Sequence, residues 1–260
     1  MQRLKFFSSG LSRARQITIW IAICIVLVLS VLDIAGWIFN IALLKSLIPQ
    51  WESMKLITAI SFIFAVLTLV IYLADFPAVI RKVLPLLLTT LICCVSLITI
   101  YSCIYCFSTG HESSLTRVSF LSWFLSPANR MAFLTACNFL LSGCILILLS
   151  SYKVKAFSIA IILVIPVFLI SYFTIVSYIL DVNSLIELSH ISISLNSSIA
   201  FCCLCSAILL IKPDSWFLRP IISRDTAGMI SRRLLFPLII LPIVIGWMRI
   251  QGERGGLFES

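Results

Sequence analysis

Seven long runs of apolar residues restrict the folds open to this chain more than any other feature of its sequence. The runs are separated by polar and charged stretches and lie near residues 17–44, 56–76, 83–107, 131–151, 156–180, 193–211 and 234–250. A helix needs about 20 apolar residues to cross the roughly 30 Å hydrocarbon core of a bilayer. Because each run is close to this length or longer, the sequence predicts about seven transmembrane helices.

The composition excludes a water-soluble globule. Hydrophobic residues make up 61% of the chain and charged residues only 11%, against about 45–50% and about 25% in soluble domains. The runs also lack the apolar–polar alternation that marks the strands of outer-membrane barrels. We therefore expect an all-α fold, a polytopic transmembrane helix bundle over residues 17–250.

The basic residues predict how the bundle is oriented. With the N-terminus in the cytoplasm, thirteen of the nineteen Lys and Arg residues fall in cytoplasmic segments, as the positive-inside rule requires. Residues 1–16 are then a basic cytoplasmic segment and residues 251–260 an outer one. The net charge of +9 thus reflects orientation in the lipid bilayer, and we expect no nucleic acid as a partner, since the basic loop 212–233 is too short to form a folded binding surface.

Two of the runs resemble each other. When residues 131–149 are laid on residues 193–211, small residues coincide, Phe139 falls on Phe201, and both segments end in aliphatic residues. Both runs lead from the outside inward in the predicted topology, so the match indicates a parallel repeat of helix pairs. The alternative is two ordinary spans rich in Leu and Ile.

Polar residues inside the runs are candidates for a functional site, because polar groups are costly in lipid. Asp33 is the clearest, and Trp37 and Asn40 follow it at helical spacing on the same face. The topology places further polar residues toward the same outer side, namely Asn138, Asn183, His190 and Asn196. Together they predict an outward-facing site for a small polar or cationic ligand, or a proton-sensitive Asp33. Alternatively, Asp33 only fixes helix packing through hydrogen bonds.

The ten cysteines suggest a metal site only at one place. Cys103 and Cys106 lie near the outer end of the third run, and His111 and His190 fall on the same side. Such a set suits zinc, copper, haem or a disulfide. Because Cys-x-x-Cys arises readily in a Cys-rich span, we expect no metal and no other cofactor, and we expect the remaining cysteines to pack as small apolar residues.

The last run and the segment after it carry the most distinctive motif. Its residues are Arg232, Arg233, Pro237, Pro242, Gly246, Trp247, Gly252, Glu253 and Arg254. This motif resembles the multi-pass membrane input region at the N-terminus of bacterial PAS-containing histidine kinases and some diguanylate cyclases. Residues 135–143 also approach a Thr-Ala-x-x-Phe-Leu-Leu-x-Gly stretch of that region, and the likeness covers residues 126–257.

The resemblance implies a sensory input module in the bacterial inner membrane, working as a homodimer and passing its signal to cytoplasmic signalling domains. Members of that family add one more helix after the motif, so we expect this chain to be the input half of a larger signalling protein. The chain has no kinase motif and no paired carboxylates or Ser/Lys arrangement, so we do not expect it to be an enzyme. The alternative is a small multi-pass transporter or channel.

Overall fold

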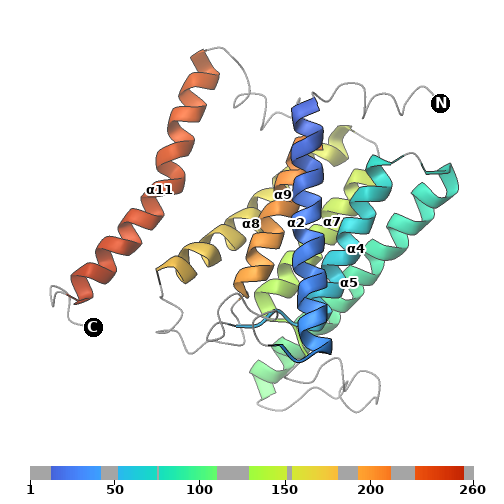
Figure 1. Cartoon of the computed structure of the whole chain (residues 1–260), viewed down its shortest axis with the longest axis horizontal. Helices are drawn as coiled ribbons and strands as arrows, with labels where there is room; N and C mark the ends of the chain where they lie inside the picture. Colours follow the sequence, from blue (N-terminus) through green and yellow to red (C-terminus); the bar gives the residue numbers. More distant parts are fainter. Residues whose placement is uncertain are drawn as a thin grey trace.

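The computed structural model describes residues 13–41, 52–74, 76–109, 129–150, 154–180, 193–211 and 226–254. Within these ranges all regular structure is α-helical (Figure 1), and each predicted run overlaps one helix. The helices are α2 (Arg13–Ile38), α4 (Leu56–Leu73), α5 (Ala78–Thr109), α7 (Phe133–Ser150), α8 (Val154–Ile179), α9 (Leu195–Ile211) and α11 (Thr226–Arg254). The expected all-α fold is confirmed.

Among the described residues, five helices are long and apolar enough to cross a membrane, namely α2, α4, α5, α7 and α8. Helix α9 is equally apolar but has 17 residues. Long apolar helices of this kind are stable only where lipid replaces water around them. The chain is therefore a membrane-embedded helical protein, while the count of seven spans stays a prediction.

Six of the helices form a ring in which three inner helices are surrounded by three outer helices. Helices α4, α7 and α9 lie inside, where α4 contacts both α7 and α9. Each outer helix bridges two inner ones: α2 packs on α9 and α4, α5 on α4 and α7, and α8 on α7 and α9. Short connections, residues 74–77 and 151–153, join α4 to α5 and α7 to α8 as antiparallel hairpins (Figure 1).

Three phenylalanines, one from each inner helix, meet at the centre of the ring. Phe62, Phe139 and Phe201 are fully buried. Their ring centroids lie 4.6–4.8 Å apart, and their planes are inclined by 60–61°, which is favourable for aromatic pairs. At the level of these three rings, this aromatic cluster fills the space between the inner helices.

Small residues and hydroxyls allow the helices to pack closely. A Cβ atom added to Gly143 would collide with Cys93 Sγ and lie 3.6 Å from the Thr89 carbonyl oxygen, so α7 and α5 are close at this point. The hydroxyls of Ser30, Ser61 and several others donate to the carbonyl one turn back at 2.8–3.1 Å. These bonds satisfy polar groups within an apolar bundle.

Several helix boundaries differ from the predicted runs. Helix α2 begins at Arg13 rather than at 17 and ends at Ile38 rather than at 44, because Asn40 adopts a left-handed backbone conformation with φ of 53°. Helix α11 runs to Arg254, so residues 251–254 of the predicted outer segment are helical. A helix extends as far as its backbone hydrogen bonds continue, and these can continue past the point where hydropathy falls.

Helix α11 stands apart from the ring in Figure 1. Many of its large apolar side chains are exposed, Leu241 and Trp247 each by 57%. Gly246 approaches the bundle, because a Cβ atom there would collide with Leu180 Cδ1 beyond the end of α8. Exposed apolar side chains along such a helix suit contact with lipid.

Candidate polar site

A layer of buried polar side chains lies beside the aromatic cluster, toward the N-terminal ends of the inner helices. One turn before each phenylalanine is a buried hydroxyl residue, Thr58, Thr135 and Ser197. Residues four apart share a helix face, so the hydroxyls lie on the same face as the phenylalanine rings. Serine and threonine are small enough to let the three helices approach closely here.

Asn138 is fully buried on α7 and points to the neighbouring outer helix. Its Nδ2 donates to Ser171 Oγ of α8 at 3.3 Å, and Ser171 Oγ in turn donates to the Val167 carbonyl at 2.8 Å. Within the described part of the chain, Asn138 Oδ1 has no hydrogen-bond partner. Leaving such an oxygen buried costs about 1–3 kcal/mol, so this position is a candidate for accepting a hydrogen bond from a ligand.

Asn196 lies in the first turn of α9 and is 5% exposed. Its Oδ1 likewise has no partner among the residues that the structure describes. The turn around it is fixed by Ser194, whose Oγ lies 2.7 Å from Ser197 Oγ and accepts a 3.4 Å hydrogen bond from the Ser197 amide. This is the geometry of a helix N-cap, and it holds Asn196 at the polar end of the bundle.

Asp33 is fully buried on α2, which packs between α9 and α4. One turn further along, Trp37 Nε1 donates to the Met54 carbonyl at 2.9 Å, two residues before α4 begins. Trp37 thus places the end of α2 level with the start of α4, and Asp33 lies one turn deeper. Burying an ionisable side chain is costly in an apolar bundle, which makes Asp33 a candidate functional residue.

The predicted face of three residues on α2 is only partly present. Asp33 is buried and Trp37 is half-buried, but Asn40 is exposed and follows the end of the helix. The left-handed backbone of Asn40 rotates it away from the stripe that a continuous helix would have formed. The structure therefore brings Asp33 and Trp37 together on the bundle side and leaves Asn40 outside the site.

The other predicted site residues include a possible metal set and one further asparagine. Asn183, His111 and His190 lie outside the described residues. Cys103 and Cys106 are half-buried on α5. Among the described residues, no group of three or more His, Cys, Asp and Glu side chains is placed to hold a metal ion.

The motif residues of the last run all fall within α11. Arg233, Pro237 and Trp247 are exposed, whereas Pro242 and Gly246 are partly buried. The side chains of Arg232, Gly252, Glu253 and Arg254 lie outside the described part of the structure. The helix continues through both prolines, which each remove one backbone hydrogen bond.

The part that α4 plays in the site was not predicted from the sequence. Helix α4 carries the same spacing of a large residue, a hydroxyl and a phenylalanine as α7 and α9. The matching sets are Met54, Thr58 and Phe62; Met131, Thr135 and Phe139; and Ile193, Ser197 and Phe201. A search for a third copy would have found this signal.

The polar atoms of this layer that lack a hydrogen-bond partner among the described residues are acceptors, the side-chain oxygens of Asn138 and Asn196. Such a set suits a small cation or a ligand that donates hydrogen bonds. Comparisons with protein-family models, with curated proteins and with solved structures find no match. The function is therefore argued from the site and the topology.

Proposed function

We propose that this protein is a membrane-embedded sensory input module of a bacterial signalling protein of the histidine-kinase type, located in the inner membrane. The observation that carries the proposal is the burial of Asp33, Asn138 and Asn196 on three different helices of a bundle whose other buried polar side chains are mostly Ser and Thr hydroxyls. Polar groups in such a place are expensive, and function is the usual reason that they are kept. The motif in α11 supports the same assignment.

In this proposal a ligand at the polar site changes how the inner and outer helices pack. The aromatic cluster joins the three inner helices, so a shift of one inner helix moves its rings against the other two. A ligand shifts such an equilibrium only as far as it prefers one packing over the other. Donors to Asn138 Oδ1 and Asn196 Oδ1 would supply that preference.

We also propose that the protein has seven spans, a cytoplasmic N-terminus and a parallel repeat of helix pairs. The burial pattern of α4, α7 and α9 supports the repeat. The same positions are buried in all three segments when they are counted from Phe62, Phe139 and Phe201. They are the residues eight, four, three and one before each phenylalanine and three, four, six and seven after it. Each copy is an inner helix with an outer partner, and α2 takes the third outer place.

The test is a fusion of the chain, extended by one helix, to a cytoplasmic kinase reporter. We expect reporter output to change with small cations or amines, and Asn138→Leu and Asp33→Asn to abolish the change. The matched control is Asn40→Leu, because Asn40 is exposed outside the site, and it should respond as the wild type does.

Two outcomes contradict the proposal. If Asn138→Leu and Asp33→Asn fold normally and respond as the wild type does, the polar site is not the sensing site. If no condition alters reporter output while purified protein carries solutes across liposomes, the transporter alternative replaces the sensor. Thermal unfolding in detergent separates loss of response from loss of fold.

A further inference from the structure

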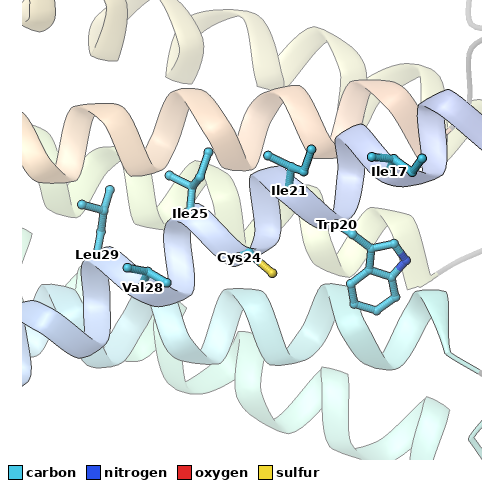
Figure 2. A pocket seen from close by; sticks show the side chains of 7 residues that line it. All are labelled: Ile17, Trp20, Ile21, Cys24, Ile25, Val28 and Leu29. Carbon is cyan, nitrogen blue, oxygen red and sulfur yellow. The ribbon is translucent and has the colours of Figure 1, made fainter.

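An apolar groove follows the outer face of α2, on the side away from the ring. It is an open groove of about 520 Å³, lined by Ile17, Trp20, Ile21, Cys24, Ile25, Val28 and Leu29. Figure 2 shows Ile17, Ile21, Ile25 and Leu29 along one edge, with Trp20, Cys24 and Val28 along the other. These lining residues present only apolar surface to the groove.

One edge of the groove contains a short side chain. Cys24 lies between Trp20 and Val28 at intervals of four residues, and it is the smallest member of that ridge. The edge from Ile17 to Leu29 is about 18 Å long at about 1.5 Å per residue. Half of a hydrocarbon core of roughly 30 Å is about 15 Å, so the groove matches the depth of one leaflet.

One end of the groove is positively charged. Arg13 is exposed and precedes Ile17 by one turn, so the two share a face of α2. The first turn of the helix contains no acidic residue, and its amide dipoles add positive potential there. A guanidinium group binds phosphate with paired hydrogen bonds.

We propose that the groove binds an anionic phospholipid of the cytoplasmic leaflet, with one acyl chain along Ile17–Leu29 and the phosphate at Arg13. Charge complementarity selects this occupant, because the cytoplasmic leaflet carries the anionic headgroups. The inference depends on the cytoplasmic N-terminus proposed above, but not on the sensory role.

Trp20 provides the probe, because it lines the groove and is 45% exposed. The full chain is reconstituted into phosphatidylcholine vesicles that contain equal fractions of either brominated phosphatidylglycerol or brominated phosphatidylcholine. Quenching of Trp20 is obtained by difference from Trp20→Phe. We expect the brominated anionic lipid to quench Trp20 at least threefold more strongly than the neutral one.

Two variants and one control test the two parts of the site. Arg13→Gln should remove the preference for the anionic lipid, and Cys24→Phe should reduce quenching by both lipids, because the added ring occupies the groove. Lys82→Gln removes an exposed cation from the first turns of α5 and should leave the preference unchanged. Equal quenching by the two lipids in the wild type, or an unchanged preference in a folded Arg13→Gln protein, would overturn the proposal.

Discussion

The rings of Phe139 and Phe201 meet with their centroids 4.8 Å apart and their planes inclined by 60°, although 62 positions separate them in the chain. Phe62 meets both rings, at 4.7 and 4.6 Å. The same offset relates the two runs that resemble each other in sequence. Residues at equivalent places in two similar helices therefore contact each other at the bundle axis.

The aromatic cluster should be a major source of stability. Phe139→Ala removes a ring with no exposed surface and leaves a cavity at the contact of three helices. We expect a loss of about 3 kcal/mol, the lower end for Phe→Ala, because lipid supplies little hydrophobic driving force and the loss is mainly one of packing. Reversible unfolding in detergent measures this loss of stability. The control is Phe173→Ala, at a side chain on α8 that is 52% exposed, which should change stability by less than about 0.5 kcal/mol.

Gly143 should not tolerate a side chain. Gly143→Ala places a methyl group against Cys93 Sγ and 3.6 Å from the Thr89 carbonyl oxygen, so either the short Cys93 side chain must rotate or α7 must move away from α5, and we expect a cost of about 1–3 kcal/mol. Gly246→Ala is the control, because the atom it meets is the end of the flexible Leu180 side chain. Equal thermal stability of the two variants would contradict the close approach of α5 and α7.

The hydrogen bond between Asn138 and Ser171 should contribute only modestly to stability. In a double-mutant cycle with Asn138→Leu and Ser171→Ala, we expect a coupling of about 0.6 kcal/mol, as for other bonds between membrane helices. Its length of 3.3 Å is at the long end of the range. A coupling above about 2 kcal/mol, read from unfolding curves, would mean that Asn138 serves mainly to hold α7 to α8.

Trp37 should anchor the end of α2 to the segment before α4. Trp37→Phe keeps most of the ring but removes the indole N–H that donates to the Met54 carbonyl at 2.9 Å. We expect a loss of about 1 kcal/mol and faster hydrogen exchange near Met54. Trp247→Phe alters an exposed residue of α11 and should leave both quantities unchanged; the opposite ranking would place the anchor elsewhere.

The sequence predicted the helices better than it predicted their contacts. Each apolar run overlaps a helix, but Asn40 fell outside the expected face because its left-handed backbone ends α2 two residues earlier. Hydropathy says nothing of such a stop. The contribution of Phe62 was not predicted, although α4 carries the same spacing of Met54, Thr58 and Phe62 that recurs in α7 and α9.

By itself, the sequence determined that this protein is helical and embedded in lipid, because runs of about 20 apolar residues satisfy their backbone only as helices in a bilayer. It also identified Asp33 and Asn138 as polar residues within those runs. Only the tertiary structure decided which faces turn inward: lipid and core are both apolar, so hydropathy does not distinguish the buried side of a membrane helix from its exposed side. That choice depends on packing, which brings Phe62, Phe139 and Phe201 together at the axis and leaves the face of α2 around Cys24 open.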